Sequence, residues 1–168
     1  MCENGQLIRY EKGIYYIPMK TPFGNSILNP NKIINRKYII ENGLVKGFYS
    51  GQTALNLLGL STQIPNSIEI CTNNETSRLR TVTIGNQSVK LRKARTTITN
   101  DNIGTLHFLE LMNGIPSGFF DKDKRAVIAK WIKDNNVTRQ TISQYAPLFP
   151  DKVMRNLVES EVIYHVAQ

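Results

Sequence analysis

The sheet of this protein is predicted most clearly by the stretch RLRTVTIGNQSVKLRKAR, residues 78 to 95. Two β-prone segments, 78–84 and 89–95, flank a four-residue linker, 85–88, whose glycine and asparagine are typical of a hairpin turn. The apolar side chains near the turn fall on one face of the pair: Val82, Ile84, Val89 and Leu91. We therefore expect an antiparallel hairpin that is buried on one face at its turn end.

The other end of this predicted hairpin is strongly basic. Between residues 76 and 97 the chain has no acidic residue and six basic ones: Arg78, Arg80, Lys90, Arg92, Lys93 and Arg95. Such a surface favours phosphate backbones or an acidic protein. Edge strands also carry Lys and Arg simply to discourage pairing with another chain. The sequence leaves both interpretations open.

Further strands and helices are predicted on the amino-terminal side of this hairpin. A strand is expected over 67–72, with Ile68 and Ile70 on one face, and a short one over 48–49. Between them, Ser50 is expected to cap a helix over 51–58 that ends at Gly59. A helix over 32–42 is expected to begin after Asn29 and Pro30 and to stop at Gly43. Two strands, 6–10 and 13–17, form an opening hairpin, and an extended linker, 18–26, follows it.

The carboxyl-terminal part is predicted to be mainly helical. Four segments have helical apolar spacing or the turn signals that bound helices: 101–112, 121–135, 138–145 and 151–160. An aspartate, Asp101, is expected in the first turn of the first of them. Residues 162–166 are predicted to form a last strand. The fold class predicted from these elements is α+β.

Charge separates the two parts of the chain. Residues 1–97 contain thirteen Lys or Arg against five Asp or Glu, whereas residues 98–168 contain eight of each, so the whole net charge of +8 lies in the first part. Only two cysteines, Cys2 and Cys71, are present, which predicts plain thiols in a reducing cytoplasm. No segment has the length of apolar sequence that a membrane span needs, so we expect no membrane partner.

The residues give little support to an enzyme. His107 lies in an apolar helical segment and His165 near the end of the chain, and neither has the spacing of a metal site. Neither a nucleophile elbow nor a glycine-rich phosphate loop is present. A metal-dependent nuclease would have only Glu69 as the acid in its central strand. We therefore expect no catalysis, no metal and no cofactor.

Several segments together resemble a known family. They are LIRYEKGIYYIP (7–18), FYSGQTALNLLGLSTQIP (48–65), IEICTNN (68–74) and VKLRKAR (89–95). Their order is similar to that in AbiEi-type antitoxins and abortive-infection regulators, with SGQTALNLLGLSTQIP the most specific part. The resemblance covers residues 5–112, and the last fifty residues match more vaguely.

The resemblance implies a fold and a function. Members of this family are transcriptional regulators of phage-defence and type IV toxin–antitoxin operons, with an amino-terminal winged helix-turn-helix and a carboxyl-terminal α/β domain. By this resemblance, residues 1–20 are the wing of a winged helix whose helices are missing, and 27–168 are the carboxyl-terminal α+β domain. Arg9 and Lys12 would then lie on the wing, in reach of phosphate. Without a recognition helix, only backbone contacts are expected.

Two functions follow as expectations. The first is an antitoxin-like transcriptional regulator that binds the DNA backbone through the basic hairpin, with DNA and a cognate toxin protein as partners. The alternative is a protein-interaction module whose basic hairpin binds an acidic partner without DNA. Phosphate contacts would give a salt-dependent affinity that is similar for all sequences, whereas arginine contacts to a protein would persist without DNA.

Overall fold

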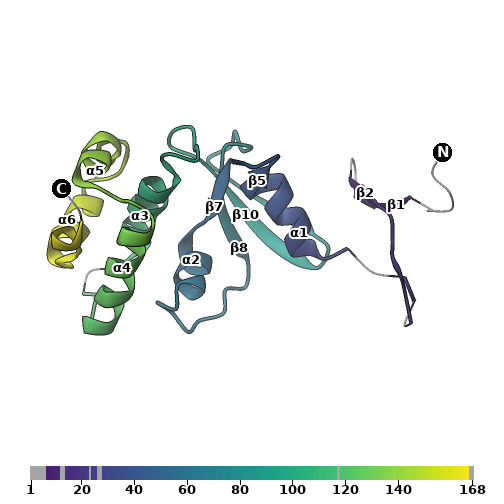
Figure 1. The fold of residues 1–168 in the computed structure, drawn as a ribbon, viewed down its shortest axis with the longest axis horizontal. Coiled ribbons are helices and arrows are strands. Elements are labelled where there is room, and N and C mark those ends of the chain that lie inside the picture. The colour runs from purple at the N-terminus through teal and green to yellow at the C-terminus, as the bar shows by residue number, and fades with distance from the viewer. Residues whose placement is uncertain (1–6, 12–13, 23, 26–27, 117, 167–168) are drawn as a thin grey trace.

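The computed structural model describes residues 7–11, 14–22, 24–25, 28–116 and 118–166. Its centre is a four-stranded mixed sheet in the order β7-β8-β10-β9. The outer pairs are antiparallel, and the central pair, β8 with β10, is parallel. A helical layer lies on one side of the sheet, and α1 and the opening hairpin lie on the other (Figure 1). The predicted α+β class is confirmed. The strand bounds are β7 Gly47–Tyr49, β8 Ile68–Thr72, β9 Leu79–Ile84 and β10 Gln87–Lys93.

The opening hairpin is present as predicted. Its strands are β1 (Ile8–Glu11) and β2 (Ile14–Tyr16), which pair antiparallel. The expected extended linker at 18–26 is wrong for its described residues, because β3 (Lys20–Thr21) and β4 (Gly24–Asn25) pair in a second small hairpin. A hydrogen bond from the Thr21 hydroxyl to the Gly24 carbonyl (2.7 Å) supports this turn.

The first helix begins as predicted but ends earlier. The Asn29 side chain accepts a hydrogen bond from the Asn31 N–H, and Pro30 follows at the first helical position of α1 (Pro30–Ile34). The helix continues as a π-helical segment, η1 (Asn35–Ile39), and the chain then becomes β5 (Ile40–Glu41), paired with β6 (Leu44–Val45).

The residue expected to end that helix has another role. Asn42 and Gly43 have φ of 52° and 80°, the geometry of a type I′ hairpin turn. The prediction that the helix runs to Asn42 was wrong, because an Asn-Gly pair is both a helix-end signal and the strongest short hairpin signal. The turn brings β6 back toward the sheet, where the Val45 N–H donates to the Asn100 side chain (2.9 Å).

Helix α2 (Gly51–Leu57) follows β7 directly. Thr53 joins it to the sheet, because its hydroxyl accepts a hydrogen bond from the Glu69 N–H (2.9 Å). Ser50 stands at the predicted N-cap position, but its side chain makes no capping hydrogen bond. Ala54 and Leu55 are buried, whereas Leu57 is 63% exposed, so the predicted apolar face is only partly in the core.

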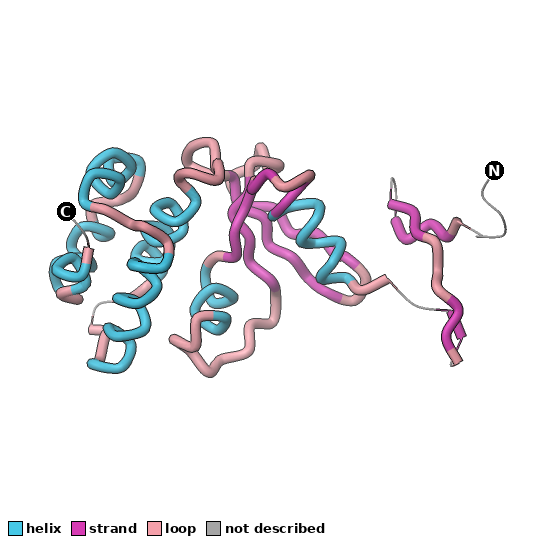
Figure 2. The backbone as a smooth tube through the Cα atoms, viewed as in Figure 1, coloured by secondary structure: helices cyan, strands magenta, loops and turns pink. Residues whose placement is uncertain are grey.

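The helical layer contains the four predicted helices, whose bounds are α3 Ile103–Gly114, α4 Lys122–Asp134, α5 Arg139–Tyr145 and α6 Lys152–Glu159. Figure 2 shows these helices in cyan together at one end of the molecule. Asp101 precedes the first turn of α3 and does not lie within it. Caps fix two of the helix starts: Asp121 accepts from the Lys124 N–H, and Thr138 forms a capping box with Thr141.

Two 3-10 turns complete the layer: η2 (Ala146–Leu148) and η3 (Val162–His165). The last strand expected at 162–166 is therefore wrong. Val162 begins the 3-10 turn and Val166 follows it in extended conformation, and both are buried. A strand would also have buried both through its period of two, so their apolar character did not distinguish the two structures. The left-handed residue Glu161, with φ of 60°, turns the chain from α6 into this segment.

Each face of the sheet carries a buried core. Ile70, Ile84, Val89 and Leu91 pack under α1 and η1 with Ile34 and Tyr38. On the opposite face, Phe48 and Cys71 join the core formed with α2, α3 and the rest of the helical layer. The side-chain alternation that the sequence predicted for 67–72 and for the basic hairpin is confirmed.

None of the helices in the described part of the chain combines the length and apolar composition that crossing a bilayer requires.

Candidate nucleic-acid interface

The basic hairpin, β9 and β10 with the residues that flank them, is closed by a tighter turn than the sequence suggested. Ile84 pairs with Gln87, so the linker is Gly85-Asn86 and β10 begins two residues before the predicted start at Val89. Gly85 has φ of 61°, which fits a type II′ turn with glycine at its first central position. The register then continues through Val82 opposite Val89 to Leu79 opposite Arg92.

The alternation along these strands divides the six basic residues of the hairpin between two faces. Arg80 and Lys93 share the face of Val82, Val89 and Leu91, which α1 and η1 cover. Lys90 and Arg92 lie on the opposite face. Arg78 precedes β9, and Arg95 follows β10. The hairpin is therefore not a single basic patch.

Three of these arginines contact acids from elsewhere in the chain. The ion pairs are Arg80 with Glu75 (2.7 Å), Arg92 with Glu69 (3.7 Å) and Arg95 with Glu110 (3.4 Å). Arg95 also donates to the Leu148 carbonyl (3.2 Å) and lies over the Phe149 ring (4.8 Å to its centroid). Arg95 therefore fastens the hairpin to the helical layer, which reduces its availability for a ligand.

Glu75 is the most enclosed of the three acids, with its side chain only 2% exposed. Burial by itself would raise the pKa of this carboxyl. Hydrogen bonds donated by the Ser77 N–H, Arg80 and the Thr76 N–H outweigh burial and hold the pKa below its ordinary value. The carboxylate thus fixes the chain just before β9 and holds Arg80 by its Nε.

The outer part of the second face forms what we call the open face: Leu79, Thr81, Thr83, Ser88, Lys90 and Arg92. Leu79, Thr81, Thr83 and Arg92 are exposed, while Ser88 and Lys90 are half-buried. Within the described residues, Arg78, Lys90 and Lys93 make no ion pair. Lysine, arginine and hydroxyl side chains are the groups that contact phosphate oxygens. The open face therefore has the chemistry of a phosphate-binding surface.

The predicted wing residues lie apart from the open face. Arg9 lies in β1 opposite Tyr15 and is exposed, and Lys12 lies outside the described residues. The opening hairpin does reach the basic hairpin through Tyr10, which packs on the core under α1. A Cβ at Gly85 would lie 2.3 Å from the Tyr10 hydroxyl, so the two hairpins meet at the Gly85 turn.

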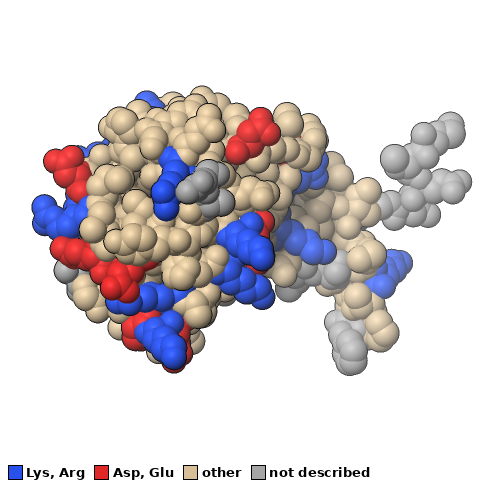
Figure 3. All heavy atoms as spheres, turned by 60° about the vertical axis from the view of Figure 1, so that its left-hand side comes forward, with Lys and Arg blue, Asp and Glu red and all other residues tan. Residues whose placement is uncertain are grey.

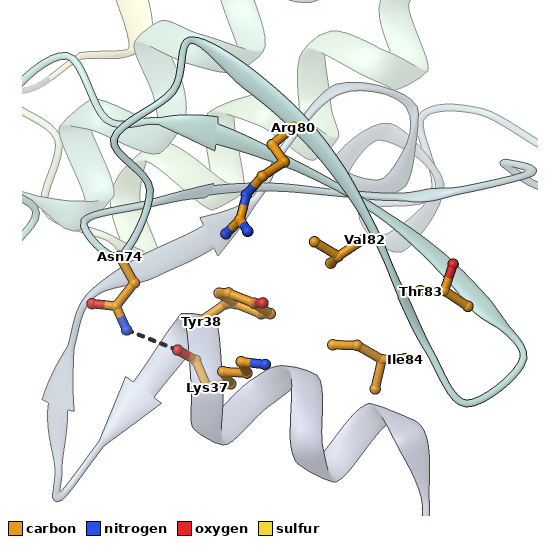
Figure 4. Close-up of a pocket in the computed structure, with 7 residues that line it drawn as sticks. All are labelled: Lys37, Tyr38, Asn74, Arg80, Val82, Thr83 and Ile84. Atoms are coloured by element: carbon orange, nitrogen blue, oxygen red, sulfur yellow. Dashed lines mark hydrogen bonds between the residues drawn. The ribbon is translucent and has the colours of Figure 1, made fainter. Parts of the chain in front are cut away.

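A second basic group was not singled out from the sequence. Lys32, Arg36 and Lys37 lie on α1 and η1, and the spacing of four residues between Lys32 and Arg36 was the signal available for it. Lys37 also lines an open cavity of about 690 Å³ beside β9 (Figure 4). The other residues that line this cavity are Tyr38, Asn74, Arg80, Val82, Thr83 and Ile84.

Charge on the surface follows the division seen in the sequence. Figure 3 shows blue Lys and Arg atoms gathered over the middle of the molecule with little red, while blue and red alternate at the end formed by the helical layer. The first 97 residues have five acids, and three of these, Glu41, Glu69 and Glu75, each lie in an ion pair with a basic residue of the same part.

His107 and the Cys71 thiol are both enclosed in the protein. His107 stacks on Phe48 (4.8 Å between ring centroids) and meets the edge of Trp131 (5.2 Å). Burial lowers the pKa of its imidazole to about 4, against a hydrogen bond with the Tyr49 backbone that raises it. Burial likewise raises the pKa of the Cys71 thiol to about 12. Within the described chain, no cluster of His, Cys, Asp or Glu is arranged to hold a metal ion.

Comparison with known proteins places the chain in a family. The model described as "Family of unknown function (DUF6088)" matches residues 1–138, and the chain belongs to this family. The match runs from the opening hairpin through the sheet and the basic hairpin to the end of α4. Neither the curated proteins nor the solved structures include a match to this chain.

Proposed function

We propose that this protein is a non-enzymatic regulator of the antitoxin kind, acting in the cytoplasm, that contacts the phosphates of duplex DNA through the open face. The observation that carries the proposal is the placement of Lys90 and Arg92 on one face of β10, beside the hydroxyls of Thr81, Thr83 and Ser88. Backbone contacts of this kind give affinity that depends on salt and little on sequence.

Two further observations support it. The excess of positive charge lies in the half of the chain that carries the sheet, and a local excess of one sign draws a charged polymer from a distance. The order of segments also resembles that of AbiEi-type regulators, which suggests a toxin–antitoxin or phage-defence operon and a cognate toxin as a second partner. The resemblance supports the proposed biological role, and the open face supports the proposed contact with DNA phosphates.

The test is the salt dependence of DNA binding. Fluorescence anisotropy of a labelled duplex from the protein's own upstream region, compared with a scrambled duplex, should give similar and salt-steep affinities. Lys90→Gln should lower the slope of log K against log salt by about one unit. Lys130→Gln removes the same charge from an exposed position on α4 and is the matched control, with the slope unchanged.

No binding at low salt, together with no effect on the product of a neighbouring toxin gene, would contradict the proposal. Equal slopes for Lys90→Gln and Lys130→Gln would mean that binding follows net charge and does not use the open face. If the protein cleaved the duplex in the presence of a divalent metal and Glu69→Gln abolished the cleavage, the nuclease hypothesis would be supported instead.

A second candidate is a protein-interaction module for an acidic partner. It is favoured by the three carboxylates, Glu69, Glu75 and Glu110, that already pair with arginines of the hairpin. These pairs are a precedent for carboxylate contact at this hairpin, and the cations that make no ion pair within the described residues, Arg78, Lys90 and Lys93, are left for a partner. Retention by a neighbouring gene product in DNA-free pull-downs at physiological salt would distinguish this candidate from DNA contact.

A further inference from the structure

The outer edge of the sheet at β9 has an unpaired backbone. In a hairpin closed by a two-residue turn, Ile84 and Gln87 exchange both backbone hydrogen bonds, and so does every second pair after them. Leu79, Thr81 and Thr83 belong to the intervening pairs, so their N–H and C=O groups point away from β10. No backbone or side-chain hydrogen bond occupies these groups within the described residues.

The cavity of about 690 Å³ follows this same edge on the α1 side. Ile84 and Val82 form its apolar part, and Tyr38 closes the inner side. Figure 4 shows the terminal nitrogens of Arg80 pointing down into this space toward Tyr38, and Asn74 held at the far end by its 2.9 Å hydrogen bond to the Lys37 carbonyl. A side chain from a neighbouring strand would enter this space.

The charge of the cavity specifies what fits. Lys37 and Arg80 line it, and none of the described residues that line it is an acid. Arg80 is held at its Nε by Glu75, so the guanidinium is oriented before any ligand arrives, which reduces the entropy lost on binding. The two terminal nitrogens of Arg80 remain, and a carboxylate is the group that best accepts hydrogen bonds from this edge of a guanidinium.

We propose that β9 is a docking edge for an extended acidic segment of a partner protein, which pairs with Leu79, Thr81 and Thr83 as a fifth strand. Alternate side chains of that segment face Ile84, Val82 and Arg80 in turn, which favours two apolar residues and then an acidic one at every second position. The two proposals use different groups: DNA contact depends on the cationic side chains of Lys90 and Arg92 on the open face, whereas docking depends on the backbone edge of β9 and on the cavity on the α1 side.

The probe is a fluorescein-labelled synthetic peptide in which every second residue is, in turn, valine, valine and glutamate, with threonine between them. Fluorescence polarisation with the full chain should give saturable binding. Replacing the glutamate by lysine should weaken it about tenfold, because an attraction to Arg80 and Lys37 becomes a repulsion. N-methylation of alternate backbone amides leaves every side chain in place and should abolish binding if a strand pair forms.

Thr81→Pro is the protein-side variant. Proline is tolerated where the N–H faces away from the sheet, so the hairpin loses no ladder bond, but the edge loses a donor at its centre. Peptide affinity should fall about tenfold or more. Lys90→Gln should leave the peptide affinity unchanged while lowering the DNA salt slope, which separates the two contacts.

Hydrogen exchange of the unaltered protein keeps the test decisive if Thr81→Pro does not fold. Saturating peptide should slow exchange at the amides of Leu79, Thr81 and Thr83 while the inward-pointing amides of β9 change little. Absence of binding, or binding that survives both N-methylation and Thr81→Pro, would overturn the proposal and leave the charges of β9 as protection against edge pairing. Failure of peptide binding with an intact DNA salt slope would leave the DNA-contact proposal standing.

Discussion

The two faces of the central sheet support cores of different kinds. Twenty-one buried apolar residues, from Phe48 on the sheet to Val166 near the end of the described chain, form the core on the side of α2 and α3. On the side of α1 and η1 the described residues contribute eight. Helices cover the larger core. The smaller core borders the cavity beside β9, which basic side chains line.

This difference separates stability from binding. A closed apolar core contributes most of the free energy of folding through burial, and little of it is accessible to a partner. Beside the smaller core, polar contacts such as the ion pair of Glu75 with Arg80 add to the apolar packing. The edge of the sheet and several cations remain at the surface there. We expect substitutions in the larger core to change stability and those along β9 and β10 to change binding.

The largest effect is expected for Phe108→Ala. Phe108 has no exposed surface and lies on α3 in the larger core, near the Trp131 ring (6.4 Å between centroids). Removal of a buried aromatic ring leaves a cavity and should lower the free energy of unfolding by about 4 kcal/mol. Urea unfolding measures it. Met154→Ala, at a side chain 40% exposed on α6, is the control and should cost well under half as much. Equal losses would contradict the assignment of the main core.

The next effect is a pH dependence located in the same core. The pKa of His107 is about 4 in the folded protein, and an imidazole in the unfolded chain titrates near 6.5. The unfolded state binds a proton more readily than the folded state does. The contribution of His107 to the free energy of unfolding is therefore fully present above pH 6.5 and is lost as the pH falls toward 4, by about 3 kcal/mol in total. His107→Phe keeps the stacking on Phe48 and should remove this loss from urea unfolding curves between these pH values. An unchanged pH profile in the variant would mean that His107 is solvated.

A smaller effect is expected beside the smaller core, on the side of α1 and η1. Glu75→Gln keeps the shape of the side chain but removes the charge that accepts from Arg80 and from two backbone N–H groups. The free energy of unfolding should fall by about 2 kcal/mol. Glu41→Gln is the matched control, because Glu41 pairs with Lys46 at the surface with 59% of its side chain exposed, and surface ion pairs contribute little. The same loss in both variants would show that Glu75 is not a structural anchor.

The smallest effect is expected at the start of α2. Ser50 is 2% exposed, and its hydroxyl has no hydrogen-bond partner within the described residues. Ser50→Ala removes an unsatisfied buried polar atom, so stability should change by less than about 0.5 kcal/mol or rise slightly. Thr53→Val, three residues on, removes the acceptor of the Glu69 N–H and should cost about 1 kcal/mol. A large loss in Ser50→Ala would indicate a capping role for the hydroxyl.

Local patterns in the sequence predicted much of the fold. Alternation placed Ile68 with Ile70 on one face of their strand and Val89 with Leu91 on one face of the hairpin, and Asn29 with Pro30 fixed the start of the first helix. The errors came where two local signals competed. Asn42-Gly43 is a signal both for a helix end and for a hairpin turn, and it forms the turn. The apolar residues of 162–166 fit a strand, but 162–165 form a 3-10 turn.

The candidate site was predicted only in part. The sequence identified all six basic residues of the hairpin but not their partners, two of which lie on other elements: Glu110, fifteen residues from Arg95, on α3, and Glu69 in the neighbouring strand. Lys37 reaches the cavity beside β9 only because η1 packs against the sheet. Distances between segments far apart in sequence depend on packing, which no local pattern specifies.

The sequence by itself determined the α+β class, the basic hairpin and the confinement of the net charge to residues 1–97, because each depends on local periodicity or on composition. The tertiary structure alone decided which face each cation lies on, which arginines meet a carboxylate, and that β9 is an edge of the sheet. These features arise from strand order and side-chain packing, in which segments distant along the chain are brought together by burial of both faces of one sheet.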